Sequence, residues 1–173
     1  MKIGMIRNEN ATEICSICSM ETFIKKVKCE NKKKFITQLR ESIPTLQGSS
    51  ARYIHLGKIP RVYPVSEFRL NTDGGWVFKK YQGIVLVEVN RLSGTAEAEY
   101  VKAKAALLPQ TLAAMVGASG RSTKIWVRFT LPDGTLPESE EQAALFHARA
   151  YQVAVQCYQP LIPFPVTLKE PSL

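Results

Sequence analysis

The chain has 173 residues, of which 45% are hydrophobic, and a net charge of +8, which suits one domain, or one domain with an appendage. No apolar run approaches the ~18 residues of a membrane span, and the N-terminus lacks a signal-peptide core, so we expect a cytoplasmic protein without a membrane partner. Residues 1–70 carry 13 basic and 6 acidic residues, whereas residues 71–173 carry 10 and 9. This basic excess favours a polyanionic partner such as DNA.

The first 45 residues combine two short strands with a lysine-rich helix. Residues 2–7 and 11–19 are typical of strands, and residues 21–45 have a helical period ended by Pro44. The helix has two apolar stripes, which are Phe23, Ile24 and Val27, and then Phe35, Ile36, Leu39 and Ile43. Six lysines lie between or beside these stripes: Lys25, Lys26, Lys28, Lys32, Lys33 and Lys34. Because like charges at this density repel, we expect them on an open surface, either a solvated helix face or a phosphate-contacting patch.

The sequence QGSS at residues 47–50 is the best candidate for a domain boundary. It separates a basic N-terminal extension, residues 1–50, from a domain of residues 51–173. Prolines 60 and 64 favour edge strands in residues 52–65, and the sequence NTDGG at 71–75 predicts a turn.

From residue 83 onward the predicted elements are strand, helix, strand, strand, helix and a possible last strand. A nearly all-apolar strand spans residues 83–90, Thr95 is the expected N-cap of the next helix, and residues 111–129 form a hairpin. Ser139 and Gln142 form a capping box for a helix ending near Tyr158. We expect the buried stripe of that helix to comprise Ala144, Ala148, Tyr151, Val155 and Tyr158. This βαββαβ order predicts an α+β, RRM-like or ferredoxin-like fold, with helices on one sheet face and the other face available.

Glu88 and Asn90 end the first of these strands and project from one face, because they are two residues apart. Two oxygen-bearing side chains in this arrangement can share Mg²⁺ or Mn²⁺. Asn90 supplies only a neutral oxygen, so we expect Glu88 to be a weak metal ligand. The alternative is that both residues simply end a strand.

The turn GASGRS at residues 117–122 is a candidate phosphate or nucleotide site. It brings Ser119, Arg121 and nearby Lys124 together with exposed backbone N–H groups. A plain turn with solvated cations is the alternative. In the outgoing strand Lys124, Trp126 and Arg128 share one face, which predicts a basic surface with an exposed aromatic ring. Together with the lysine-rich segment, this surface predicts nucleic-acid contacts at Lys25, Lys26, Lys32, Lys33, Lys34, Trp126 and Arg128.

Three segments carry a family resemblance: GIVLVEVN, LPQTLAAMVGASGRSTKIWVRFTLPDGTLP and FHARAYQVAVQCYQP followed by PVTLKEP. Over roughly residues 60–173 the chain resembles the VirE-type N-terminal, primase-polymerase-like domain of Bacteroidetes mobile elements. That family includes mobilizable-transposon proteins labelled TnpC or excision proteins. The resemblance implies an archaeo-eukaryotic primase-polymerase fold, with an acidic first motif, a Ser-x-His second motif on a hairpin and a third acid on a later strand.

Carried over by position, Glu88 and Asn90 stand at the first motif. Ser119, Arg121 and Lys124 fall in the second motif, with Lys124 near the position of the histidine. The third acid would lie at or beyond the tail VTLKEPSL, which has no aspartate, and the Arg and Asp expected after it are missing. The implied domain is therefore cut short at its C-terminus, or a downstream domain follows it in a longer protein.

With the metal ligands degraded, the resemblance implies a non-catalytic module that binds DNA or nucleotide during transposon excision, replication or transfer. One alternative is a primase or nucleotidyltransferase that uses Glu88 with Mg²⁺ or Mn²⁺. Another is an interaction module for other mobilisation or replication proteins, docking through the apolar tail at residues 161–166.

Overall fold

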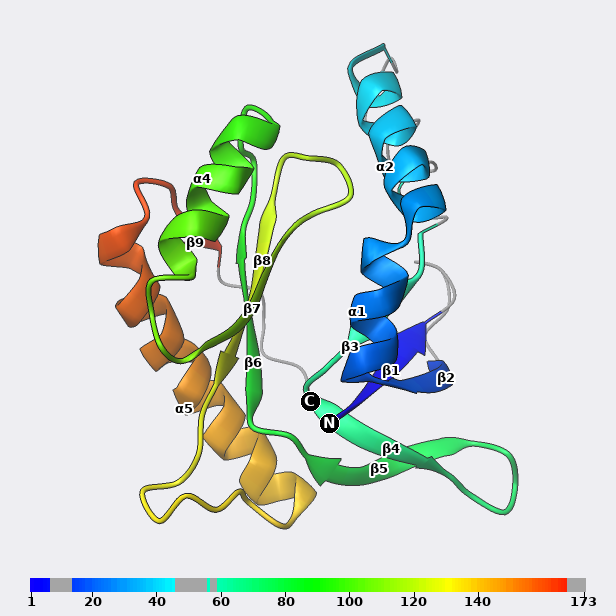
Figure 1. The fold of residues 1–173 in the computed structure, drawn as a ribbon. Helices are drawn as coiled ribbons and strands as arrows, with labels where there is room; N and C mark the ends of the chain where they lie inside the picture. The colour runs from blue at the N-terminus through cyan, green and yellow to red at the C-terminus, as the bar shows by residue number, and fades with distance from the viewer. Residues whose placement is uncertain (7–13, 46–55, 57–58, 168–173) are drawn as a thin grey trace. The chain divides into compact units, whose positions relative to one another are not determined.

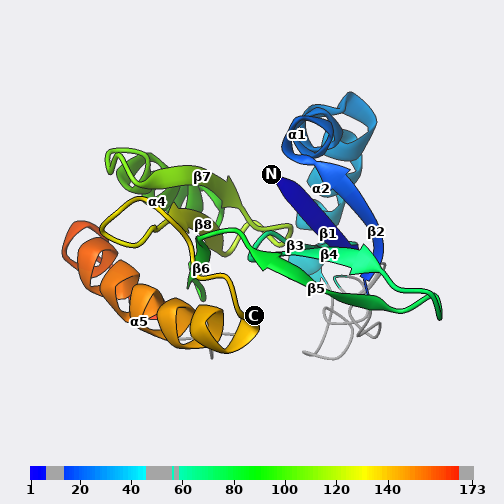
Figure 2. The same cartoon turned by 90° about the horizontal axis from the view of Figure 1, so that it is seen from below.

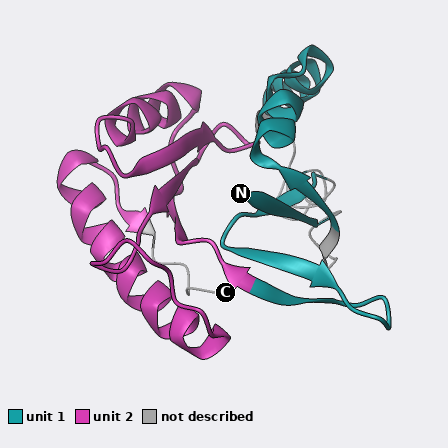
Figure 3. Ribbon diagram, turned by 60° about the horizontal axis from the view of Figure 1, so that its bottom comes forward, with its two compact units in different colours: residues 1–79 teal, residues 80–173 magenta. Residues whose placement is uncertain are grey.

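The computed structural model describes residues 1–6, 14–45, 56 and 59–167 and mixes helices with antiparallel strands, so the predicted α+β class is confirmed (Figure 1). The chain divides into two compact units, Met1–Lys79 and Lys80–Leu173 (Figure 3). The expected boundary at residue 50 lies outside the described residues.

The first unit contains a three-stranded antiparallel sheet in the order β2-β1-β3. Its strands are β1 (Lys2–Ile6), β2 (Ile14–Ser19) and β3 (Arg61–Tyr63). Because β1 pairs with β3, residues from both sides of residue 50 share this sheet. A hairpin follows, made of β4 (Ser66–Leu70) and β5 (Trp76–Tyr81). Its turn is closed by Asn71, whose Oδ1 accepts from the Gly75 amide at 2.6 Å.

The lysine-rich segment forms two helices where the periodicity predicts one. Helix α1 (Met20–Lys28) begins at Ser19, whose hydroxyl accepts from the Thr22 amide. Cys29 is extended and interrupts the helix, and α2 (Glu30–Ser42) then leads into the 3-10 turn η1 (Ile43–Thr45).

Only part of each predicted apolar stripe on these helices is buried. Phe23, Leu39 and Ile43 are buried, whereas Ile24, Val27 and Phe35 are 41–49% exposed. These three apolar side chains therefore lie at the surface of the helices, although they belong to the predicted stripes.

The second unit contains β6 (Ile84–Val89), α4 (Thr95–Ala105), β7 (Thr111–Val116), β8 (Thr123–Arg128), α5 (Glu140–Tyr158), the 3-10 turn η2 (Gln159–Leu161) and β9 (Val166–Thr167). This element order is the one predicted. The strands form one sheet in the order β7-β8-β6-β9, with each neighbouring pair antiparallel. Helices α4 and α5 lie on the same side of it (Figures 1 and 2).

The core of the second unit lies between this sheet and its two helices. Alternate residues of β6 (Val85, Val87 and Val89) and of β8 (Ile125 and Val127) form one buried cluster with α4 and α5. The helices contribute Ala98, Val101, Ala105, Ala150, Tyr151, Ala154 and Tyr158. Glu88, between two of these valines, therefore lies on the opposite face of the sheet.

The helix starts and the buried stripe of α5 differ in detail from expectation. Gly94, one residue before Thr95, is the N-cap of α4. Ser139 is the N-cap of α5 as predicted, and its hydroxyl accepts from the Gln142 amide at 3.2 Å. In place of Ala144, Ala148 and Val155, the buried stripe contains Ala143, His147, Ala150, Tyr151, Ala154 and Tyr158. Burial of His147 is possible because its ring forms a hydrogen bond with the Tyr81 hydroxyl.

Candidate functional site

Glu88 and Lys124 form an ion pair on the face of the sheet away from α4 and α5. The strand register places them directly opposite one another on β6 and β8, and Lys124 Nζ contacts Glu88 Oε1. The Glu88 side chain is 6% exposed and that of Lys124 is 42% exposed. Asn90 joins this pair, because its Nδ2 donates to Glu88 Oε2 at 3.3 Å. The structure thus brings together three of the residues singled out from the sequence.

These contacts bear directly on the expected metal site. One carboxylate oxygen of Glu88 receives a lysine ammonium, and the other receives an amide N–H from Asn90. Asn90 therefore presents a donor to Glu88, whereas a shared cation requires its carbonyl oxygen. Within the described part of the chain, no group of three or more His, Cys, Asp or Glu side chains is placed to hold a metal ion.

The hairpin turn is fixed to the loop between β6 and α4. Arg121 Nε donates to the Leu92 carbonyl at 2.9 Å, and the Leu92 amide donates to the Arg121 carbonyl at 3.1 Å. Within the turn, the Arg121 amide donates to Ser119 Oγ at 3.2 Å. The guanidinium of Arg121 is thus oriented by the loop, while the ammonium of Lys124 is held by Glu88.

Arg91 is a residue of this loop that the sequence reasoning missed. It is exposed and has a φ of 62°, and it is the sole non-glycine residue with positive φ in the described ranges. Its neighbour Leu92 makes both contacts to Arg121. Arg91 and Arg121 thus belong to two loops that hydrogen bonds connect. The strained, positive φ of Arg91 could not be predicted from the sequence.

Trp126 is not the exposed aromatic residue that strand alternation predicts. Its side chain is 1% exposed, and it lies opposite Leu86 in the register of β6 and β8. Arg128, two residues further along β8, is exposed as expected. The prediction of an exposed stacking ring on β8 is therefore wrong, because alternation identifies a face of the sheet but not what covers that face.

The lysines of α1 and α2 are all exposed, as predicted. Lys25 pairs with Glu21 at 2.8 Å, Lys33 pairs with Glu30 at 2.7 Å, and Lys26 Nζ lies 3.7 Å from the sulfur of Met5. Three others have neither a hydrogen bond nor an ion pair to any residue that the structure describes: Lys28, Lys32 and Lys34. Positive charge therefore remains uncompensated along these helices.

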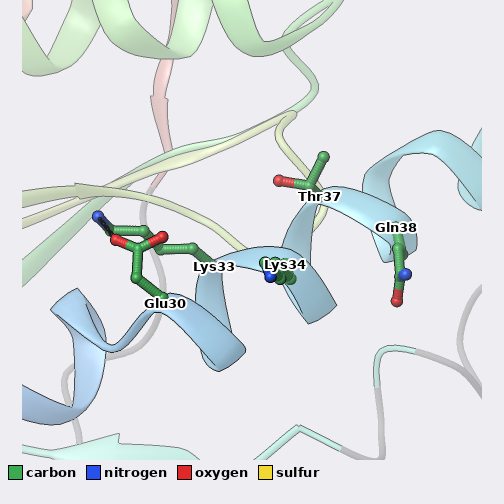
Figure 4. Close-up of a pocket in the computed structure, with 5 residues that line it drawn as sticks. All are labelled: Glu30, Lys33, Lys34, Thr37 and Gln38. Carbon is green, nitrogen blue, oxygen red and sulfur yellow. Dashed lines mark hydrogen bonds and ion pairs between the residues drawn. The ribbon is translucent and has the colours of Figure 1, made fainter.

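Helix α2 carries two further features beside these lysines. Phe35 is 49% exposed, although it belongs to a predicted apolar stripe. A hollow also lies on this helix, and Figure 4 shows Glu30 and Lys33 alongside one another there. The hollow is lined by Glu30, Lys33, Lys34, Thr37 and Gln38.

None of the helices in the described ranges combines the length and apolar character needed to cross a bilayer. Searches of curated proteins and of solved structures found no match to this chain. Residues 55–173 match the family model described as BT4734-like, N-terminal domain. The match covers more than half of the sequence and includes the whole second unit, with the Glu88–Lys124 pair and the hairpin turn. The chain therefore belongs to the BT4734-like N-terminal domain family.

Proposed function

We propose that this chain is a nucleic-acid-binding module whose helices α1 and α2 contact phosphates. The observation that carries the proposal is the exposure of Lys28, Lys32 and Lys34 without a counterion among the described residues. Residues 20–42 carry seven basic and three acidic residues. Clustered ammonium groups repel one another, and a phosphate backbone relieves that repulsion while releasing its condensed counterions.

We further propose that the module does not itself catalyse nucleotidyl transfer. Both carboxylate oxygens of Glu88 are engaged by Lys124 and Asn90. Displacing Lys124 to admit a divalent cation would break an ion pair in which the carboxylate is 6% exposed. This arrangement favours a structural role for Glu88.

The resemblance to primase-polymerase-like domains of mobile elements supplies the biological setting of the proposal. The βαββαβ order of the second unit agrees with the split β-α-β arrangement that the resemblance implies. On this basis the module acts on DNA in the cytoplasm, during excision, replication or transfer of a mobile element.

Fluorescence anisotropy of labelled DNA, titrated over salt concentration, tests the binding proposal. Replacing Lys28, Lys32 and Lys34 by glutamine in one triple variant removes up to three phosphate contacts. For single strands the slope of log K against log salt should then become shallower by about 2. The matched control replaces Lys102, Lys104 and Arg149, exposed or half-buried cations of the second unit, with the same change in net charge.

The control variant should keep the slope of the unmodified protein. Equal changes in slope for the two triple variants would assign the effect to net charge and reject α1 and α2 as the contact surface. A protein that binds no DNA at low salt would reject the proposal as a whole.

A metal-dependent nucleotidyltransferase is the second candidate, and it is favoured by the position of Glu88 and Asn90 on one face at the end of β6. It predicts nucleotide incorporation with Mg²⁺ or Mn²⁺ that Glu88→Gln abolishes. The binding proposal predicts no incorporation with either metal, and unchanged DNA affinity in Glu88→Gln.

A further inference from the structure

Phe35 is an exposed aromatic ring within the lysine-rich helices. Its side chain is 49% exposed. Lys32 lies one helical turn earlier on the same side of α2, and Lys34 precedes Phe35 directly in the sequence. Neither lysine has a hydrogen bond or ion pair to a described residue. An apolar ring is thus flanked by two uncompensated ammonium groups.

We propose that α2 binds single-stranded nucleic acid, with Phe35 stacking on an unpaired base while Lys32 and Lys34 contact the adjoining phosphates. This inference rests on the proposed function and deepens it by naming the form of the nucleic acid. Positive grooves combined with aromatic rings are how proteins hold single strands without reading their sequence. Charge complementarity selects a polyanion, and the ring selects one whose bases are accessible.

The surroundings of Phe35 favour a base over an apolar protein segment. Of the residues three and four positions away on the same side of the helix, Asn31, Lys32 and Gln38 are polar and exposed, and the one apolar neighbour, Leu39, is buried and offers a partner no further apolar surface. An amphipathic partner helix needs several apolar anchors in a groove, whereas one flat ring among charges suffices for one base. In a duplex the base faces are covered by stacking neighbours, so Phe35 cannot reach them unless a base leaves the stack.

The test compares a labelled single-stranded oligonucleotide with a duplex of the same length and sequence in anisotropy titrations with the full chain. Phe35→Ala and Phe35→Leu should each lower single-strand affinity by roughly 5- to 100-fold. Duplex affinity and the salt slope should stay unchanged, because no cation is removed. Phe35→Trp should retain or raise single-strand affinity. Phe35→Leu is the matched control for apolar bulk, since it lacks only the flat ring.

Failure of this inference can be told apart from failure of the proposed function. If the triple lysine variant reduces the salt slope but the Phe35 variants bind both forms like the unmodified protein, the stacking inference is overturned and phosphate binding stands. Equal losses for single strand and duplex, or full affinity in Phe35→Leu, would also overturn it. If no DNA binds at low salt but an acidic peptide does, both proposals fail and the helices serve a protein partner.

Discussion

Glu88 and Lys124 face each other across neighbouring antiparallel strands, and their side chains form an ion pair on the sheet face away from α4 and α5. The carboxylate is almost completely removed from water, whereas the ammonium is 42% exposed. A buried carboxylate is costly unless it is paired and hydrogen-bonded, and Lys124 and Asn90 meet both needs. The pair therefore stabilises the register of β6 against β8.

Replacing Lys124, and so removing the partner of Glu88, should destabilise the protein. Lys124→Met removes the ammonium and leaves the Glu88 charge buried without it, and we expect a loss of about 2 kcal/mol in the free energy of unfolding. In Glu88→Leu/Lys124→Met no buried charge remains, so most of that loss should be recovered. Urea denaturation of the four proteins in this double-mutant cycle measures the coupling. Strictly additive losses would show that the two residues do not stabilise each other.

Much of the second unit follows from local signals in the sequence. The apolar run of β6, the small-residue turn before β8 and the N-cap at Ser139 each specify an element within a few residues. Strand alternation also placed Glu88 and Asn90 on one face, and the structure joins them by a hydrogen bond.

Other features depend on register and on long-range packing. The pairing of Glu88 with Lys124 requires the register of two strands 36 residues apart. Trp126 is buried where an exposed ring is predicted, because periodicity gives the face of an element and not what covers that face. The buried stripe of α5 differs from the predicted one because it includes His147, whose hydrogen-bond partner Tyr81 lies 66 residues away in the sequence.

The buried pair of His147 and Tyr81 should make stability depend on pH. The two side chains are 3% and 1% exposed, and the Tyr81 hydroxyl lies 3.1 Å from Nδ1 of His147. Burial lowers the pKa of His147 to about 4 and raises that of Tyr81 well above its ordinary value. Because an unfolded histidine titrates near 6.5, the unfolded chain binds the extra proton first as the pH falls.

The neutral, buried His147 therefore contributes fully to the stability of the folded state above pH ~6.5, and this contribution is lost progressively down to about pH 4. In the unmodified protein the free energy of unfolding should fall by up to roughly 3 kcal/mol between these pH values because of His147, and in His147→Gln this fall should be absent. Denaturation at each pH measures both. Tyr81→Phe removes the hydrogen bond but leaves the imidazole buried, so its pH dependence should persist at lower overall stability. The same pH dependence in His147→Gln and the unmodified protein would contradict this assignment.

Gly83 should be much less tolerant of substitution than Gly134, although both have positive φ. Gly83 has a φ of 68°, and a Cβ there would lie 2.4 Å from the Phe129 carbonyl oxygen and 2.7 Å from a methyl carbon of Leu136. Gly134 has a φ of 83° and no atom within 4 Å of such a Cβ. Gly134→Ala thus introduces backbone strain alone and should lower the free energy of unfolding by about 1 kcal/mol. Gly83→Ala adds a clash with main chain and should cost about 3 kcal/mol or more. Equal losses in thermal or chemical denaturation would show that the backbone relaxes around Gly83.

Gln159 should control the attachment of the last strand. Its Nε2 donates to the carbonyls of Ile162 at 3.3 Å and Phe164 at 3.1 Å, and its Oε1 accepts from the Val166 amide at 3.0 Å. These bonds bend the chain after α5 so that Val166 pairs with Val89 and Thr167 with Glu88. Gln159→Ala removes all three bonds, while α5 and the β6–β8 pairing keep their own contacts.

Hydrogen exchange measured by mass spectrometry checks this prediction. In Gln159→Ala the peptide containing β9 should exchange about 10- to 30-fold faster, as expected for a loss of roughly 1.5 to 2 kcal/mol of local stability. Peptides from β8 should be unchanged, and Gln152→Ala, at an exposed position of the preceding helix α5, should resemble the unmodified protein. Faster exchange throughout the second unit would instead mean that Gln159 supports the whole fold. Selective release would expose the edge of β6 at Glu88 and Val89, because β9 is the strand that covers that edge.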